Sequence, residues 1–225
     1  MVYPNRTKAS GVWKLKNLAS LISDGEYPDA GTRSIVGGGA TPSNTNRIEF
    51  QTISTTGNGT DFGDLLGALQ AFGFASNKTR GVFGGGVNNP SAPGNTNVEQ
   101  YITFSSQGNT ADFGDLSQTR RDVHGTSNKT RGVFCGGNTG TYPSFSSTDT
   151  MDFIEMATLG NATDFGNLSV SRADTATFAS PLRGYNACGA TAPTQSNVID
   201  VINFSTTGNA ADFGDASETK AYMGG

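Results

Sequence analysis

Short runs of apolar and polar residues, bounded by turn sequences, recur along most of this chain. Residues 151–156, MDFIEM, read as a half-buried strand, and a Gly-Asn turn follows them. Residues 121–127, 132–134 and 164–168 are three further runs of this kind in the same stretch. The pattern predicts four short antiparallel strands, joined by turns, in a unit of about 50 residues.

The unit repeats. A nine-residue phrase occurs as GNGTDFGDL, GNTADFGDL, GNATDFGNL and GNAADFGDA. Its Asp-Phe steps begin at Asp61, Asp112, Asp164 and Asp212, which by subtraction lie 51, 52 and 48 residues apart. A second phrase, TRSIVGGG in its first copy, returns half a unit away. A period of this length is typical of propellers and repeat arrays. We therefore predict an all-β fold, a four-bladed β-propeller over residues 32–225.

Composition narrows the classes of partner. Charged residues make up 15 % of the chain, against about 25 % in typical globular domains. The net charge is −4 and no basic stripe is present, so we expect no nucleic-acid partner. No apolar run is long enough to span a bilayer and the first residues lack a secretory signal. We expect a protein made in a cytosol, without membrane insertion.

Repeated apolar and basic residues are candidates for the joints between units. We expect the four DFG phenylalanines to fill the gaps between adjacent sheets; they are Phe62, Phe113, Phe165 and Phe213. Four arginines recur at the same period and are expected to form ion pairs with the DFGD aspartates; they are Arg33, Arg80, Arg131 and Arg183. We expect Cys135 and Cys188 to be buried small side chains and not a disulfide.

The two ends of the repeat suggest how it closes. The first unit lacks an innermost strand, whereas residues 219–225, TKAYMGG, continue beyond the last DFGD phrase. We predict that this segment pairs beside residues 32–39 and closes the first blade, which would leave no open sheet edge. The alternative is an open arc that a neighbouring subunit completes.

Residues 1–31 lie outside the repeat. Trp13, Leu15, Leu18 and Ile22 fall on one side of a predicted short helix. The segment is either a cap on the propeller or an anchor into a larger assembly. If it is an anchor, its deletion should leave a folded propeller that no longer joins that assembly.

Function is sought where the units differ. The loops that follow the glycine strands vary in length and sequence, so they form a candidate binding surface. Its candidate residues are Asn88, Asn89, Tyr142, Phe145 and the Pro193–Thr194 step. Exposed aromatic rings such as those of Tyr142 and Phe145 stack on sugars or anchor protein partners. The alternative is that these side chains fold back over the propeller.

Motifs that resemble catalytic sites have structural explanations. The kinase triplet DFG occurs four times here without a catalytic loop, and His124 is the only histidine, so a multi-histidine metal site is excluded. Asp61 with Asp64 could gather calcium, but turn capping is the better explanation. We expect no enzyme activity, no catalytic residue, no metal and no cofactor.

The units resemble kelch repeats. They share the double glycine after an apolar strand, the strand NVEQYITF at residues 97–104, the Phe113 and Leu116 pair, and a following arginine at Arg120 and Arg172, with Lys220 in the last unit. Phenylalanine takes the usual tryptophan position. The wording is more similar still to kelch-like repeats in tail and fibre proteins of bacteriophages, especially those of marine cyanobacteria. Residues 10–28 also resemble the N-terminal segments of such virion proteins.

This resemblance implies a non-enzymatic virion structural protein. It would be a tail, fibre or capsid-appendage propeller, made in the host cytoplasm, that contacts other virion proteins and a host-surface glycan or protein. By analogy with phage fibres we expect a homo-oligomer, a trimer in the first instance. One alternative is a cytosolic kelch-type interaction adaptor. Another is a propeller carbohydrate-active enzyme, which would need two carboxylates across a pocket lined with aromatic platforms.

Overall fold

The computed structural model describes residues 33–40, 42–88, 94–141, 144–191 and 193–222. The chain divides into two units, Met1–Thr32 and Arg33–Gly225, and the described residues all belong to the second. Several predicted positions lie outside the described residues and stay predictions; they are Trp13, Leu15, Leu18, Ile22, Asn89 and Tyr142.

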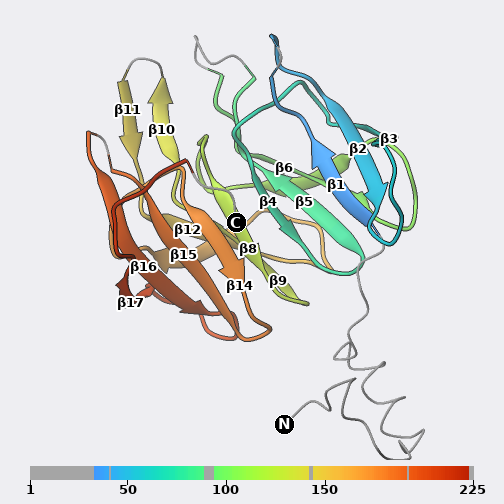
Figure 1. Ribbon diagram of the computed structural model, residues 1–225. Coiled ribbons are helices and arrows are strands. Elements are labelled where there is room, and N and C mark those ends of the chain that lie inside the picture. The colour runs from blue at the N-terminus through green and yellow to red at the C-terminus, as the bar shows by residue number, and fades with distance from the viewer. Residues whose placement is uncertain (1–32, 41, 89–93, 142–143, 192, 223–225) are drawn as a thin grey trace, which may run out of the picture. The chain divides into compact units, whose positions relative to one another are not determined.

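The fold is all-β. The described residues form 17 strands in five antiparallel sheets and contain no helix (Figure 1). The strands are β1 (Arg33–Gly37), β2 (Arg47–Thr52), β3 (Thr60–Asp64), β4 (Gly73–Ser76), β5 (Arg80–Gly84), β6 (Val98–Thr103), β7 (Ala111–Asp115), β8 (His124–Ser127), β9 (Arg131–Cys135), β10 (Asn138–Thr141), β11 (Ser144–Ser147), β12 (Thr150–Glu155), β13 (Thr163–Asn167), β14 (Ala176–Ala179), β15 (Arg183–Ala190), β16 (Gln195–Asn203) and β17 (Ala211–Asp215).

Four sheets follow one another along the chain. The first has the order β1-β2-β3, the second β4-β5-β6-β7, the third β8-β9-β12-β13 and the fourth β14-β15-β16-β17. The hairpin β10-β11 is inserted between β9 and β12. The predicted four strands of the third unit are confirmed, although β8 begins at His124 and not at residue 121. Asp122 has a φ of 55°, and this left-handed conformation interrupts the extended chain before β8.

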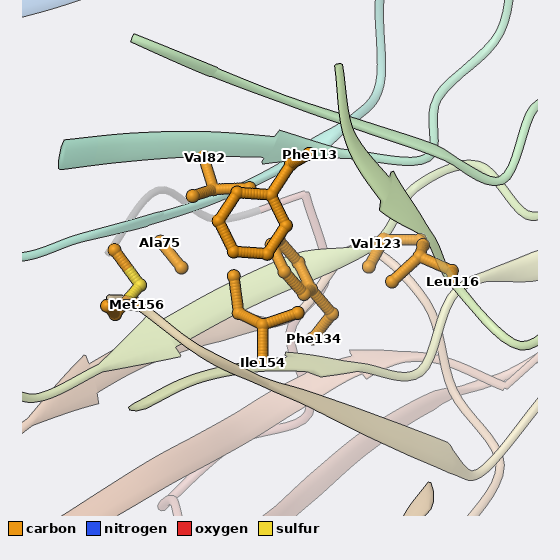
Figure 2. Close-up of a cluster of buried hydrophobic side chains, with 8 residues drawn as sticks. All are labelled: Ala75, Val82, Phe113, Leu116, Val123, Phe134, Ile154 and Met156. Carbon is orange, nitrogen blue, oxygen red and sulfur yellow. The ribbon is translucent and has the colours of Figure 1, made fainter. Parts of the chain in front are cut away.

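Consecutive sheets pack face to face through apolar clusters. Phe62, Phe113 and Phe165 lie on the outermost strand of the first three sheets and are at most 3 % exposed. Each ring packs against apolar residues of the following sheet. In Figure 2 the ring of Phe113 lies above Ile154 and Phe134, which belong to the third sheet. Burial between neighbouring sheets therefore forms the core.

The fourth phenylalanine of the set does not follow this pattern. Phe213 lies on β17, the outermost strand of the fourth sheet, and is 58 % exposed. Its predicted burial is wrong for the described structure. The physical reason is that, among the described residues, no further sheet covers this face.

The repeated GN–DFGD phrase forms a backbone joint between sheets. The N–H groups of Gly108, Gly160 and Gly208 donate to the carbonyls of Phe62, Phe113 and Phe165 at 2.8, 2.8 and 2.6 Å, respectively. A side chain at the DFG glycine of the preceding unit would collide with this turn, at Gly63 as at Gly114 and Gly166. These glycines also have positive φ values of 137° to 156°, so both the close approach and the backbone conformation require glycine.

The predicted ion pairs of the TR-phrase arginines are wrong. Among the described residues, none of the four arginines pairs with a DFGD aspartate. The guanidinium groups of Arg33, Arg80 and Arg131 instead lie over aromatic rings of their own sheets and donate to carbonyls of the following sheet. The rings are those of Phe50, Tyr101 and Phe153, and the carbonyls those of Phe104, Met156 and Phe204. Arg183, in the fourth sheet, is exposed.

Buried ion pairs occur at another repeated arginine. Arg120 pairs with Asp152 at 2.7 Å and Arg172 pairs with Asp200 at 2.6 Å, and all four side chains are almost completely buried. Each arginine lies just before the innermost strand of a sheet, and each aspartate lies on the third strand of that sheet. The pairs therefore attach the connecting segment to the sheet that it enters.

Both cysteines are buried and free, as predicted. Burial raises the pKa of the Cys135 thiol to about 12, so the thiolate is strongly disfavoured. Cys135 therefore acts as a small apolar side chain in the joint between the third and fourth sheets.

The predicted closing strand is not found in the described residues. There, β1 pairs only with β2, and residues 219–222 form no strand. The backbone of Lys220 instead bonds to Ser196 and Gly189 beside the fourth sheet, and the Tyr222 N–H donates to the carbonyl of Asp174 at 3.1 Å. The segment thus continues the path of the fourth unit. Residues 223–225 lie outside the described part of the chain.

One core position carries an acid without a partner. Glu99 lies on β6 opposite Gly84, as Met151 of the next unit lies opposite Cys135. Both carboxyl oxygens are buried without a hydrogen bond among the described residues. Burial first, and then the charge of Asp152, raises the pKa of Glu99 from 4.5 to about 8, so this side chain is protonated at neutral pH.

Removing a buried ring should destabilise the fold far more than removing an exposed one. We expect Phe113→Ala to lower the free energy of unfolding by about 3–5 kcal/mol, because it leaves a cavity between two sheets. Phe213→Ala is the matched control, with an expected loss below about 1 kcal/mol. Urea unfolding monitored by circular dichroism measures both. Equal losses in the two variants would refute the sheet packing.

Glu99 should make stability depend on pH. The folded pKa of about 8 lies above the unfolded value of 4.5, so the unfolded state binds fewer protons between these values. The free energy of unfolding should fall with rising pH across this window, by roughly 3 kcal/mol at pH 7. Glu99→Met should remove most of this slope in urea titrations from pH 4 to pH 8, whereas Glu218→Met, at an exposed position, should retain it.

Candidate binding surface at the loop end of the sheets

The variable loops are joined to one another by asparagine side chains. Asn44, in the loop between β1 and β2, donates to the carbonyls of Val87 and Asn88 at 3.0 and 2.9 Å. Asn95, one unit later, donates to the carbonyl of Gly140 in the β10-β11 hairpin at 2.8 Å. These bonds link three successive loops at one end of the sheets. In Figure 1 the hairpin stands at the upper left and points away from the sheets.

A repeated hydroxyl fixes the point at which each loop rejoins its sheet. In every unit a Thr or Ser accepts a hydrogen bond from the backbone N–H two residues later, a turn that these side chains favour. The accepting residues are Thr45, Thr96, Thr148 and Ser196, and the donors are Arg47, Val98, Thr150 and Val198. The variation in loop length is therefore confined to the residues before this turn.

The predicted loop residues have different environments. Asn88 is exposed, and its N–H donates to the carbonyl of Gly94 at 3.1 Å. Pro193 and Thr194 are exposed in a turn in which the hydroxyls of Thr191 and Thr194 lie 2.8 Å apart. Phe145, on β11, is 36 % exposed. The structure thus brings Asn88 next to Asn44 of the preceding loop.

Four residues that sequence reasoning overlooked meet at the inner ends of the units. Ala71, Asp122, Asp174 and Tyr222 have left-handed φ values of 58°, 55°, 52° and 59°. Each of the last three donates its N–H to the carbonyl of the one before, at 2.7, 3.3 and 3.1 Å in chain order. We call this set the inner row. The residue before each of the first three pairs with a loop base, for example Arg121 with Asn138. The inner row therefore adjoins the variable loops.

Charge gathers beside the inner row. The Asp122 carboxylate accepts hydrogen bonds from the Arg121 and Asn138 side chains, both at 3.0 Å. Burial first, and then the Asp122 charge, raises the pKa of Asp174 to about 6, while Arg121 opposes this shift. The Arg121 guanidinium also lies 5.1 Å from the centre of the Phe145 ring. Two carboxylates, one cation and one aromatic ring are thus connected on the loop end.

His124 lies next to this group, but its side chain is less able to bind a partner. Burial lowers the pKa of His124, so its imidazole is neutral at pH 7. Its Nδ1 is buried without a hydrogen-bond partner among the described residues. The described residues also hold no group of three or more His, Cys, Asp or Glu side chains that could bind a metal ion. The surface offers carboxylate acceptors and an aromatic ring, which suit hydroxyl or amine donors of a partner.

The sequence does contain a signal for the two carboxylates of the inner row. The residue two positions after the repeated arginine is an aspartate at Asp122 and Asp174, whereas the same position holds Ala71 in the unit without that arginine. These carboxylates are therefore a difference between units, like the loops. They were overlooked because the left-handed backbone that gathers them is not evident from composition.

Searches against known proteins leave the family open. No family model matches the chain, and no curated protein matches it. Within the described residues, no helix is present that could cross a bilayer.

The two carboxylates of the inner row should titrate as neighbours. Asp122→Asn removes the negative charge that helps to keep Asp174 protonated, so the pKa of Asp174 should fall from about 6 towards its ordinary value. Carboxyl chemical shifts followed by NMR from pH 3 to pH 8 measure this. Asp112→Asn, on an exposed strand position of another unit, is the control and should leave Asp174 unchanged. If the pKa of Asp174 is unchanged in Asp122→Asn, the two carboxylates do not interact.

Proposed function

We propose that this chain is a non-enzymatic structural protein of a virion, in which the four sheets are kelch-like blades of a β-propeller. It belongs to a tail, fibre or capsid appendage, and its loop end contacts other virion proteins or a host-surface glycan or protein. The observation that carries the proposal is the division of the repeat into uniform joints and a variable loop end.

The uniform part leaves little room for a site. The backbone joint is repeated between all three pairs of consecutive sheets, and its glycines, phenylalanines and arginine contacts serve packing. Surfaces that recognise a partner need exposed side chains that differ from unit to unit. At the loop end, Phe145 and Tyr222 have both properties, at 36 % and 78 % exposed. The side chains of Arg121 and Asp122 differ between units but are only 16 % and 13 % exposed.

The chemistry of the loop end suits a hydroxyl-rich partner. An aromatic ring such as Phe145 can stack on the apolar face of a sugar, and the carboxylates of Asp122 and Asp174 can accept hydrogen bonds from hydroxyl groups. Asn95 bonds to the hairpin that carries Phe145, and the Asn138 side chain donates to the Asp122 carboxylate. These bonds hold the ring and one carboxylate in place before binding, which lowers the entropy cost of recognition. The resemblance to phage tail and fibre repeats supports placing this surface on a virion.

One observation favours the alternative of a carbohydrate-active enzyme. Asp174, with its pKa of about 6, lies next to Asp122, and glycoside hydrolases pair a protonated acid with a carboxylate. The two residues touch through their backbones, since Asp174 donates its N–H to Asp122. A cytosolic interaction adaptor is the third function, and it would use the same loop end.

The proposal is tested with the full chain on a glycan array and on host cells. We expect binding that Phe145→Ala weakens about tenfold or more, since a stacked ring is lost. Leu159→Ala, at a position that is 55 % exposed in the connection between β12 and β13, is the matched control and should bind normally. Binding that is equal in all three proteins would contradict a role for the loop end.

Two further readouts separate the alternatives. Mass spectrometry of virions purified from the infected host should detect the chain, and its absence would leave the cytosolic adaptor. Product analysis on any glycan that binds should show no cleavage. Cleavage that Asp174→Asn abolishes would instead identify an enzyme.

A further inference from the structure

The first and fourth sheets expose complementary faces. We infer that the outer face of the fourth sheet binds the first sheet of a second copy of this chain, in the register of the joints within the chain. The inference rests on the sheet packing and does not depend on the proposed role in a virion. Five features of the internal joints recur on the first and fourth sheets. Each sheet carries one side of the joint, and the two sides do not contact each other within the described residues.

The backbone joint supplies the first feature. In the second, third and fourth units the Gly-Asn turn bonds to the preceding DFG strand, as Gly108 does to Phe62. The turn of the first unit, Gly57–Asn58, makes no such bond within the described residues. At the other end, the space beside Gly214 is open, whereas the same space beside Gly63 holds the next turn. The first unit thus has a Gly-Asn turn without a DFG strand to bond to. The fourth sheet has a DFG strand without a turn bonded to it, within the described residues.

Apolar exposure is the second feature. Phe213 is 58 % exposed, although Phe62, Phe113 and Phe165 are buried. It makes an edge-on contact with Tyr185, which in turn stacks on Phe178, at centroid distances of 5.2 and 5.0 Å. The three rings form one aromatic surface on the outer face of the fourth sheet.

The first sheet exposes apolar residues at the opposing positions, which is the third feature. Val36 lies opposite Glu49 as Phe134 lies opposite Asp152, and Ile53 corresponds to Met156. Phe134 and Met156 are buried by the preceding sheet, whereas Val36 and Ile53 are 57 % and 59 % exposed. In the later units, a preceding sheet covers these two positions. The exposure of Val36 and Ile53 therefore indicates that a sheet from another copy covers them.

The fourth feature is an arginine. Arg33, Arg80 and Arg131 reach across a joint to the carbonyl that follows the third strand of the next sheet. Arg183 is the corresponding residue of the fourth sheet and is exposed. By the same alignment its acceptor would be the carbonyl of Ile53.

Charge complementarity is the fifth feature. Lys220 stands at the position of Arg120 and Arg172, and Glu49 at that of their partners Asp152 and Asp200, because each of these acids lies opposite the first Asp of DFGD. Within the chain, Lys220 lies 3.8 Å from Glu218, and Glu49 lies 3.0 Å from Arg47, with all four side chains at least 38 % exposed. The acid and the base of the repeated pair are thus present at opposite ends of the chain.

One difference shows why the joint would be reversible. Ser34 and Gln51 occupy the positions that Gly132 and Ile154 fill in the third unit, and the Ser34 hydroxyl donates to the Gln51 side chain at 2.7 Å. This polar pair makes the first sheet compatible with water when it is uncovered. The contact would therefore be weaker than the internal joints.

The geometry points to a second copy as the occupant, because both faces are exposed at once in the unit Arg33–Gly225. A contact between different faces of identical chains is heterologous and builds a ring or a filament, depending on whether the rotation closes. Two chains would bring together eight sheets, the upper end of the usual propeller range of about four to eight blades.

Charge reversal in trans tests the inference. Lys220→Glu and Glu49→Lys should each weaken the self-association of the full chain about tenfold or more, as measured by sedimentation velocity, since like charges then meet across the joint. An equimolar mixture of the two variants should associate again, because each joint regains one acid and one base. Asp112→Lys, an equal change of charge on an internal unit, is the control and should associate normally.

Surface apolar variants give an independent measurement. Phe213→Ser should abolish association at concentrations where Leu159→Ser, at a comparably exposed position, does not. The double change Ser34→Gly with Gln51→Ile restores the residues of the later units and should tighten association about tenfold. Circular dichroism and thermal unfolding would confirm that each variant is folded.

Three outcomes would overturn the inference. A full chain that stays monomeric at all concentrations would show that no second copy binds. Association that persists unchanged in Phe213→Ser and in both charge reversals would place the contact elsewhere, such as in residues 1–32. The third outcome combines two results. If the charge-reversal variants stay monomeric when mixed, and the cysteine of an Ile53→Cys variant is protected from labelling, the chain closes on itself.

Discussion

The close approach of two backbones at the GN–DFGD joint is the constraint on which the rest of the structure depends. A Gly-Asn turn of one unit donates to the outermost strand of the unit before it, as Gly160 does to Phe113 at 2.8 Å. Only glycine fits beneath the turn, since any side chain at Gly114 would meet the backbone of Gly160. With the backbones held at this separation, the phenylalanine between them is enclosed. The repeated phrase therefore sets the spacing between sheets.

The buried ion pairs have a different role. A buried pair such as Arg120 with Asp152 loses hydration on both sides, so it adds little net stability and mainly defines one arrangement. The first joint shows that the pair can be replaced, because Leu69 and Gln100 stand at these two positions. There Gln100 accepts hydrogen bonds from the Leu66 N–H and the Thr110 hydroxyl, both at 2.7 Å. Neither charged partner is present at these positions, so the first joint holds no unpaired charge there.

Periodicity predicted the strands and the burial of Phe62, Phe113 and Phe165, because a repeated phrase must occupy a repeated environment. The same logic failed at Phe213, since an end unit has the sequence of the repeat without its neighbour. It also failed for the TR-phrase arginines, whose aromatic and carbonyl partners lie on different strands and cannot be distinguished from carboxylates by spacing. The inner row required knowledge of four left-handed residues. Aspartate adopts this conformation more often than most residues, but alanine and tyrosine do not, so the row has no common signal in propensity.

The loops and the ends of the chain are thus where this fold departs from its own repeat, and recognition and assembly are assigned to them for that reason. The joint itself is tested most directly by amide hydrogen exchange in dilute solution, where the chain is expected to be monomeric. The N–H groups of Gly108, Gly160 and Gly208 should exchange slowly and that of Gly57 rapidly, since among the described residues only the first three donate to a preceding sheet. Equal protection at all four glycines, or rapid exchange at all four, would contradict the account.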